Sequence, residues 1–250
     1  MRKKIKRSVN VWAVMGLVGF FVLLAGATSS RRGDTIRALG GDIIITPIQH
    51  GSLMIQYGGK VFHVDPWSKG DYSGLPKADV ILITDIHGDH MDPSMVEKLS
   101  KPSTLVLAPA AVTETLVRAQ VIQNGQEILY KGFKVEGVPM YNLVRGPRPG
   151  ALFHDKGRGN GYVLTLGDKR LYFSGDTACT PEMKVLKDID VAFVCMNLPY
   201  TMTPDEAAGC VAAFQPKIVY PYHYRGSDLT KFQGGLVNQP RVEVRLRKWY

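Results

Sequence analysis

Short apolar segments separated by turn residues are the first pattern in the chain. Residues 43–46 and 52–57 are rich in β-branched and aromatic side chains, and Gly58-Gly59, between 52–57 and 60–64, fits a two-residue hairpin turn. Residues 78–84 (ADVILIT) form a continuous apolar run, which is typical of a strand buried on both faces. These patterns predict short strands joined by turns, followed by a buried strand.

Helices are predicted where capping residues precede apolar positions at helical spacing. Asp92 as N-cap and Pro93 in the first turn begin one helix. Thr203 begins another, and Glu206 completes a capping box with it. Residues 112–119 also show a helical pattern, so we expect a helix there.

Further strands are expected on both sides of a long loop. They cover residues 104–108, 126–138 (two strands around Gly132), 161–166, 170–174, 191–196 and 218–221. The loop at 142–161 is rich in Gly, Pro and Arg, and its length indicates a function. Groups of strands with interspersed helices in both halves predict an α+β fold with two central sheets and outer helices, in a single domain over residues 42–250.

The first 27 residues have the pattern of a targeting segment. A basic stretch precedes an apolar run at 11–25, and Ala25-Gly26-Ala27 fits a cleavage site. The run is shorter than the ~20 residues of a transmembrane helix. We therefore expect a signal peptide over 1–27, with an uncleaved membrane anchor as the alternative, and a linker over 28–41. Both alternatives predict a protein that is exported or held at the membrane.

Much of the net charge lies in that same segment. The chain carries +9, of which residues 1–27 supply five through Lys and Arg and contain no acid. The remaining +4 is weak evidence for a nucleic-acid partner. We therefore expect a small-molecule substrate and no nucleic acid.

The three cysteines are Cys179, Cys195 and Cys210. An odd number in an exported protein leaves at least one free thiol. Because all three lie in apolar or helical surroundings, we expect small core residues and no disulfide framework.

The most informative segment is residues 84–92 (TDIHGDHMD), which follows the buried strand. Side chains two apart in an extended segment point the same way, so Asp85 and His87 can bind one ion. Asp89 and His90 can address a second ion nearby. Carboxylate and imidazole groups are ligands for Zn, Mn or Fe. The segment therefore predicts a site for one or two divalent ions.

This segment resembles the His-x-His-x-Asp-His signature of the metallo-β-lactamase superfamily, with Asp85 in the first His position. Ser174-Gly175-Asp176-Thr177 resembles the Gly-Asp turn whose Asp bridges two metals, and Tyr222-His223-Tyr224 resembles the last His ligand. The resemblance covers residues 42–226. It implies a four-layer αββα sandwich with the ions at one edge, between the sheets.

Other segments narrow the resemblance to one branch of the superfamily. They are residues 138–142 (VPMYN), 153–154 with 159–162, and 201–204 (TMTP). They are similar to small hydrolases related to the ascorbate-phosphate lactonases and the N-acylethanolamine phospholipase D enzymes.

Carried over by position, the resemblance implies two ions bridged by Asp176. The implied ligands of the first ion are Asp85, His87 and one residue of a third motif. Those of the second ion are Asp89, His90 and His223. For the third motif we favour His154, in the long loop, and Asn142 is the alternative. Because a carboxylate at Asp85 is a harder ligand, it shifts the expected preference from Zn towards Mn or Fe, and it also allows a single tightly bound ion.

Some residues are expected to support the site without binding an ion. His50 lies in a segment similar to one that faces the site in the related families. Asp65 ends a strand and is expected to orient a ligand histidine through its second ring nitrogen. The long loop also carries Arg145, Arg148 and Arg158, which have the charge to bind a substrate anion, but we favour the interpretation that they are solvated loop residues.

The expected activity is hydrolysis of an ester, lactone, amide or phosphodiester by a metal-activated water. Asp89 is expected to accept a proton from that water as well as to bind metal. The alternative, which Asp85 keeps open, is a non-catalytic protein that binds a metal or ligand on a degenerate site.

Overall fold

The computed structural model describes residues 33–250. The signal peptide or anchor predicted for residues 1–27 lies outside them. None of the helices in the described part is both long and apolar enough to cross a membrane.

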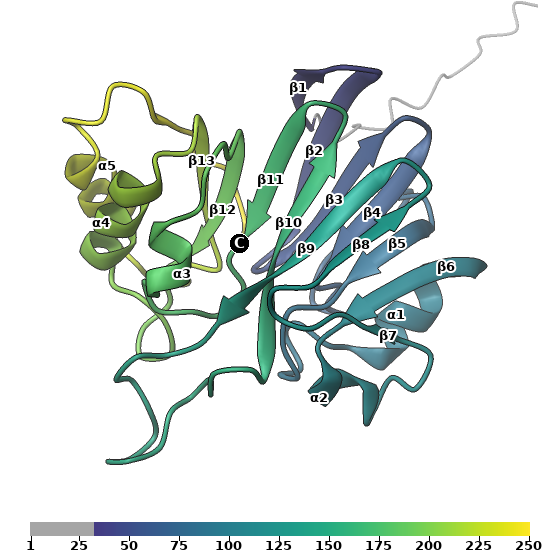
Figure 1. The fold of residues 1–250 in the computed structure, drawn as a ribbon, viewed down its shortest axis with the longest axis horizontal. Helices are drawn as coiled ribbons and strands as arrows, with labels where there is room; N and C mark the ends of the chain where they lie inside the picture. Colours follow the sequence, from purple (N-terminus) through teal and green to yellow (C-terminus); the bar gives the residue numbers. More distant parts are fainter. Residues whose placement is uncertain (1–32) are drawn as a thin grey trace, which may run out of the picture. The chain divides into compact units, whose positions relative to one another are not determined.

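Two seven-stranded sheets form the centre of the domain (Figure 1). The strands of the first follow one another in sequence order: β1 Asp34–Ala38, β2 Gly41–Gln49, β3 Ser52–Tyr57, β4 Lys60–Val64, β5 Ala78–Leu82, β6 Ser100–Ala108 and β7 Gln120–Val121. Pairs from β1 to β4 are antiparallel, whereas pairs from β4 to β7 are parallel.

The second sheet repeats this arrangement. Its strands are β8 Glu127–Tyr130, β9 Phe133–Met140, β10 Gly159–Leu166, β11 Lys169–Phe173, β12 Val191–Cys195, β13 Ile218–Tyr222 and β14 Glu243–Val244. Pairs from β8 to β11 are antiparallel, and pairs from β11 to β14 are parallel.

The helices cover the outer faces of the two sheets. They are α1 Pro93–Leu99, α2 Ala110–Thr113, α3 Pro181–Lys184, α4 Pro204–Phe214 and α5 Leu229–Gly235. Helices α1 and α2 lie beside the first sheet, and α3, α4 and α5 lie beside the second (Figure 1). The predicted four-layer α+β sandwich is therefore confirmed.

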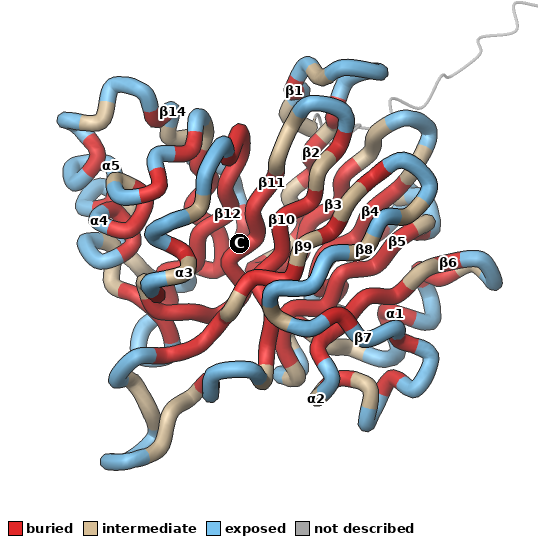
Figure 2. The backbone as a smooth tube through the Cα atoms, in the orientation of Figure 1, coloured by how far each residue is buried: buried red, intermediate tan, exposed pale blue. Residues whose placement is uncertain are grey.

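The main core lies between the sheets, where each contributes alternate apolar side chains. Ile45 and Phe62 of the first sheet belong to one buried cluster with Val163 and Phe173 of the second. A smaller cluster packs α1 and α2 against the outer face of the first sheet. The central strands are accordingly buried, while turns and outer helix faces are exposed (Figure 2).

The predicted helix starts are confirmed at two positions. Asp92 caps α1 by accepting hydrogen bonds from the backbone of Ser94 and Met95. Thr203 and Glu206 form the predicted capping box of α4.

The helix predicted over residues 112–119 is confirmed only at Val112 and Thr113 and is wrong for the rest. Helix α2 ends at Thr113, and turns lead from there to β7. Val112, Leu116 and Ala119 are buried as a helical pattern requires. However, the β-branched residues between them disfavour a helix, and the chain has to straighten to pair with β6.

Strand β1 lies inside the segment 28–41, for which we expected a linker. It pairs with β2, and Ile36 is its one buried side chain. A single buried position has no period, so the sequence pattern could not reveal this strand.

The expectation of small core cysteines without a disulfide framework is wrong for two of the three, and the expected free thiol is present. Cys179 and Cys210 form a disulfide with their Cα atoms 5.6 Å apart, and Cys195 is a buried free thiol. The bond joins the loop after β11 to helix α4. It depends on how α4 packs, which sequence spacing does not encode.

Candidate metal centre

Polar residues follow strand ends that lie on one side of the domain. Asp65 follows β4, the segment Asp85–His90 follows β5, Asp176 follows β11, and His223 follows β13. These strands run parallel to a neighbour in each sheet, so their carboxyl ends face the same way. His154 reaches the same place from the long loop between β9 and β10.

His90 is fully buried, and Asp65 holds its ring. Nδ1 of His90 lies 2.8 Å from Oδ2 of Asp65, and Thr84 donates its backbone N–H and hydroxyl to that carboxylate at 2.8 and 2.6 Å. Burial lowers the pKa of His90, but the charges of Asp176 and Asp65 raise it well above its ordinary value. Its Nε2 lies 3.5 Å from Oδ2 of Asp176, so an ion binding there displaces the proton on Nε2.

His154 is buried and is held by Asn142. Oδ1 of Asn142 accepts hydrogen bonds from the backbone N–H of His154 at 2.9 Å and from its ring Nδ1 at 2.7 Å. The amide of Asn142 in turn donates to the carbonyl of Tyr200. Burial lowers the pKa of His154 to about 4, so its ring is neutral and Nε2 keeps a lone pair. The side-chain oxygen and nitrogen of Asn142 are therefore both hydrogen-bonded, whereas Nε2 of His154 is available to bind an ion.

Asp176 lies between the three histidine rings that surround it. Its Oδ2 is 3.5 Å from Nε2 of both His90 and His154, and its Oδ1 is 3.3 Å from Nε2 of His223. Burial raises the pKa of Asp176, but the charges of His223 and His90 outweigh this and hold it well below its usual range. Asp89 completes the group, with its Oδ2 3.5 Å from Nε2 of His223.

Four buried atoms at or within 3.5 Å of the Asp176 carboxylate have no hydrogen-bond partner within residues 33–250. They are Nε2 of His90, Nε2 of His154, Nε2 of His223 and Oδ1 of Asp176, and Nδ1 of His223 has none either. Unpaired buried polar atoms are rare because each costs free energy. Nε2 of His90 and Nε2 of His223 lie 3.5 and 3.3 Å from the carboxylate oxygens of Asp176, close to the ~3.3–3.5 Å between ligands of one tetrahedral ion with bonds of ~2.0–2.2 Å. The residues therefore fit a divalent ion.

Asp85 and His87 form a second part of the site. Nδ1 of His87 lies 2.7 Å from Oδ2 of Asp85, which is also 3.7 Å from Nε2 of His154. Asp85 is fully buried, whereas His87 is exposed. Burial raises the pKa of Asp85, but the hydrogen bond to His87 and the charges of His90, His87 and Arg158 lower it to about 2.

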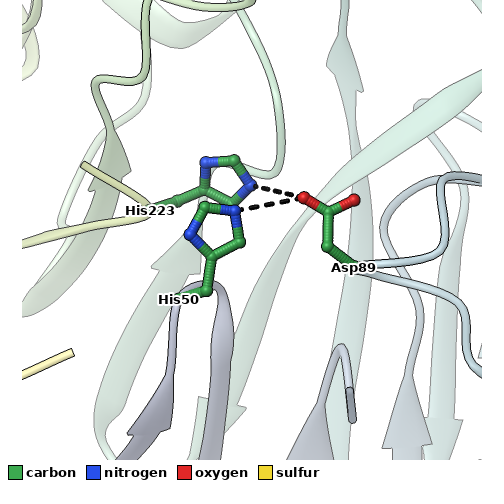
Figure 3. Close-up of side chains that lie close together, drawn as sticks. All are labelled: His50, Asp89 and His223. Carbon is green, nitrogen blue, oxygen red and sulfur yellow. Dashed lines mark hydrogen bonds and ion pairs between the residues drawn. The ribbon is translucent and has the colours of Figure 1, made fainter. Parts of the chain in front are cut away.

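His50 contacts the site through Asp89. Its Nε2 lies 3.1 Å from Oδ2 of Asp89, and Figure 3 shows this contact beside the one from His223. On the other side, Nδ1 of His50 hydrogen bonds to the hydroxyl of Tyr250, which also accepts the backbone N–H of Arg225. Burial lowers the pKa of His50 to about 4. The neutral ring thus accepts from Tyr250 at Nδ1 and donates to Asp89 at Nε2.

Three of these residues have left-handed backbones. φ is 57° at His50, 44° at Asp65 and 47° at His223. Non-glycine residues rarely adopt this conformation because it strains the backbone. Such strain is found mainly at functional sites. The backbone N–H of His223 donates to the carbonyl of His50 at 3.1 Å, which holds two of the three strained residues together.

A pocket of about 350 Å³ opens onto this group. It is lined by His50, His87, Asp89, Phe153, His154, Asp176, Asn197, Tyr200, His223 and Arg225. The rings of Phe153 and Tyr200 meet edge to face at 5.1 Å. The volume suits a small molecule, and the pocket has both polar and apolar walls.

The structure accounts for two of the three loop arginines. Arg158 pairs with Asp85, and Arg145 pairs with Glu206, so both are engaged within the protein. Sequence reasoning did not connect Arg158 with Asp85, although a carboxylate at the end of a buried strand calls for a cation. Tyr250 was also missed, and no sequence signal could have found it because it lies outside every motif.

Comparison with known proteins places this site in a family context. A family model described as the beta-lactamase superfamily domain matches residues 44–223, which include the cluster after β5, Asp176 and His223. A UPF0173 metal-dependent hydrolase from Geobacillus sp. (strain WCH70) is 32% identical over 189 residues, covering 70% of this chain and 82% of that protein.

Solved structures agree with the family match. A protein from Parabacteroides distasonis ATCC 8503, proposed to be a metal-dependent hydrolase, is 41% identical with a TM-score of 0.82, over 87% of this chain and 99% of that chain. Igni18, a metallo hydrolase from Ignicoccus hospitalis KIN4/I, is 21% identical with a TM-score of 0.69, over 82% of this chain and 95% of that chain. The second likeness concerns the fold alone.

Proposed function

Because the chain belongs to the metallo-β-lactamase superfamily, with relatives among the UPF0173 metal-dependent hydrolases, we propose that it is a hydrolase that cleaves a small ester, lactone, amide or phosphodiester with the help of a divalent ion. One observation carries the proposal: buried Nε2 atoms of three histidines, from three separate segments, converge on the carboxylate of Asp176 without hydrogen-bond partners among the described residues. A divalent ion bound there supplies Lewis acidity and lowers the pKa of a water towards neutrality.

The residues that would hold the ion differ in how they are supported. His90 is oriented by Asp65, and His154, which lies beside the ion position, is oriented by Asn142, so both rings are fixed before any ion arrives. Such supports strengthen metal binding because the ligands lose little freedom. The donor set of imidazoles and carboxylates suits Zn, Mn or Fe. An ion bound at Asp85 would have a carboxylate ligand, which favours Mn or Fe over Zn.

Asp89 is the residue we propose to handle the proton of the attacking water. It lines the pocket, and its side chain is 30% exposed. Burial raises its pKa, but the contacts with His223 and His50 and the charges of His90 and His223 outweigh this and hold the pKa far below its usual range. His50 donates to Oδ2, which leaves Oδ1 of Asp89 free to accept a hydrogen bond from water. His50 therefore orients Asp89 and keeps its charge in place.

The pocket walls support a substrate with both a small apolar group and an acidic one. Phe153 and Tyr200 form an apolar wall. Arg225 supplies a positive charge to the same pocket. Its side chain is exposed there and forms no ion pair among the described residues. With Arg145 and Arg158 engaged elsewhere, Arg225 is the better candidate to bind a substrate anion. A closer likeness to the lactonase and phospholipase branch remains a prediction.

We also propose that the protein works outside the cytoplasm, exported or anchored by its first 27 residues. Support comes from the basic and apolar N-terminal pattern and from the Cys179–Cys210 disulfide, since structural disulfides persist mainly in oxidising compartments. Fractionation of the producing cells, followed by mass spectrometry of the N-terminus, tests this. Full-length protein in the cytoplasmic fraction would contradict it.

The proposed activity is tested by screening metal-loaded protein against lactones, phosphodiesters, thioesters and amides. We expect turnover that falls at least 100-fold in His223→Ala. The control is His63→Gln, because His63 is also a buried histidine but hydrogen bonds to Pro76 outside the site. An equal loss in both variants, or turnover that survives His223→Ala, would contradict the proposal. Tight metal binding without turnover would favour the non-catalytic alternative.

A further inference from the structure

Arg158 forms a two-pronged ion pair with Asp85. Its Nε lies 3.2 Å from Oδ1 and its Nη2 lies 3.1 Å from Oδ2 of Asp85. Asp85 is fully buried, and the side chain of Arg158 is 21% exposed. Guanidinium matches a carboxylate in this geometry and stays charged at every physiological pH.

The pair uses the acceptor positions that an ion would need. A carboxylate has about four of them, two on each oxygen. Arg158 takes one on each oxygen of Asp85, and His87 takes the second one on Oδ2 at 2.7 Å. Oδ2 is the oxygen that lies 3.7 Å from His154, so the oxygen facing the site is the one already used twice.

The contact between His87 and Asp85 is also too close for two ligands of one ion. Ligands on a tetrahedral ion with bonds of ~2.0–2.1 Å lie ~3.3 Å apart. By contrast, the atoms of Asp89, Asp176 and His223 are spaced at 3.3 and 3.5 Å. Within residues 33–250, neither Asp89 nor Asp176 forms an ion pair with a lysine or arginine. The two halves of the site therefore differ in charge as well as in spacing.

We propose that the guanidinium of Arg158 replaces one of the two ions, so that the protein binds a single divalent ion tightly, among His90, Asp176, His223 and Asp89. This inference rests on the proposed function and specifies its cofactor. A second dication at Asp85 meets the fixed charge of Arg158 and has to displace a hydrogen bond from Oδ2, the oxygen that faces the site. Arg158 thus keeps a positive charge beside the pocket that does not depend on metal supply.

A titration of metal-free protein with Mn²⁺ and with Zn²⁺ tests the proposal, with stoichiometry read by calorimetry and elemental analysis. We expect one tight equivalent in the wild type and a second that binds at least 100-fold more weakly. In Arg158→Gln the second equivalent tightens at least tenfold. Arg145→Gln is the matched control, because Arg145 lies in the same loop but pairs with Glu206; we expect it to behave as the wild type.

A second variant keeps the test decisive if Arg158→Gln does not fold. In Asp85→His/Arg158→Gln the buried charge and its partner are both removed, and we expect two tight equivalents with coupled Mn²⁺ signals in electron paramagnetic resonance. Two equivalents of similar affinity in the wild type, or one in both folded variants, would overturn this inference alone. No bound ion in the wild type would overturn the proposed function with it.

Discussion

At the residue scale, His90 and His154 are held by partners that leave Nε2 of each ring free. Nδ1 of His90 is fixed by Asp65, and Nδ1 of His154 is fixed by Asn142. His223 is held instead through its backbone, by the carbonyl of His50. The free atoms all face Asp176, so an ion finds its ligands already in place and loses little affinity to reorganisation.

The support from Asp65 is tested by Asp65→Asn. The amide preserves the shape but removes the charge that holds the His90 proton on Nδ1. We expect the dissociation constant of the bound ion to rise about 10- to 100-fold in a chelator competition assay. Asp92→Asn changes the same groups at the cap of α1, outside the site, and should leave the constant unchanged. Equal affinities for wild type and Asp65→Asn would refute the role of Asp65.

Asp85 predicts how the metal-free protein responds to acid. Its pKa is about 2 in the folded protein and 3.8 ordinarily. Because the folded value is the lower one, the carboxylate stabilises the fold above about pH 4, and this contribution is lost as pH falls towards 2. The shift corresponds to about 2 kcal/mol in the free energy of unfolding.

Urea unfolding of metal-free protein at several pH values measures that contribution. We expect the free energy of unfolding of the wild type to fall more steeply between pH 4 and pH 2 than that of Asp85→Asn. Parallel curves would show that Asp85 is not preferentially ionised in the folded protein.

Part of the site can be recognised from the sequence, and part of it cannot. The cluster of Asp85 to His90 is recognisable because its members are adjacent in the chain. Asp176 and His223 are recognisable only through the resemblance. The pairing of Arg158 with Asp85 spans 73 positions and depends on how the loop folds back, so no local pattern reveals it.

At the element scale, apolar runs and caps predicted most strands and two helix starts, since these are local properties. Strand β1 was missed because it buries one side chain, and the helix over 112–119 was overestimated because pairing of β7 with β6 competes with it. Pairing and packing are long-range effects, so they override a weak local preference.

The Cys179–Cys210 disulfide is an element-scale prediction. It closes a loop with a sequence separation of 31 between the Asp176 loop and α4. The chain-entropy account gives about 3–4 kcal/mol of stabilisation for a loop of this size. In Cys179→Ser/Cys210→Ser we expect the free energy of unfolding in urea to fall by about that amount.

The control for the disulfide is Cys195→Ser with reductant added to each sample. Reductant should destabilise the wild type and Cys195→Ser, but not the double variant. A wild type that is insensitive to reductant would contradict a structural disulfide.

At the scale of the whole molecule, two similar half-structures bring their parallel strands together, and the site lies where the carboxyl ends of both sets meet. An ion bound by residues from both sheets therefore links the two sheets to each other. Removal of the ion should loosen the packing of one sheet on the other.

This linkage predicts that metal stabilises the fold. At a free ion concentration 100-fold above the dissociation constant, binding adds about 2.7 kcal/mol to the free energy of unfolding. We expect EDTA to lower the unfolding temperature of the wild type and to leave that of His223→Ala almost unchanged. An equal response of the two proteins would show that the chelator acts elsewhere.

The central claim is that the convergent atoms around Asp176 bind a divalent ion, and anomalous diffraction tests it most directly. Crystals grown with Mn²⁺ or Zn²⁺ would be measured on both sides of the absorption edge of the metal. The account predicts one strong anomalous peak, within ~2.0–2.3 Å of Nε2 of His90, Nε2 of His223 and a carboxylate oxygen of Asp176. No peak at that position in metal-loaded crystals, or a peak bound only by residues outside the site, would contradict it.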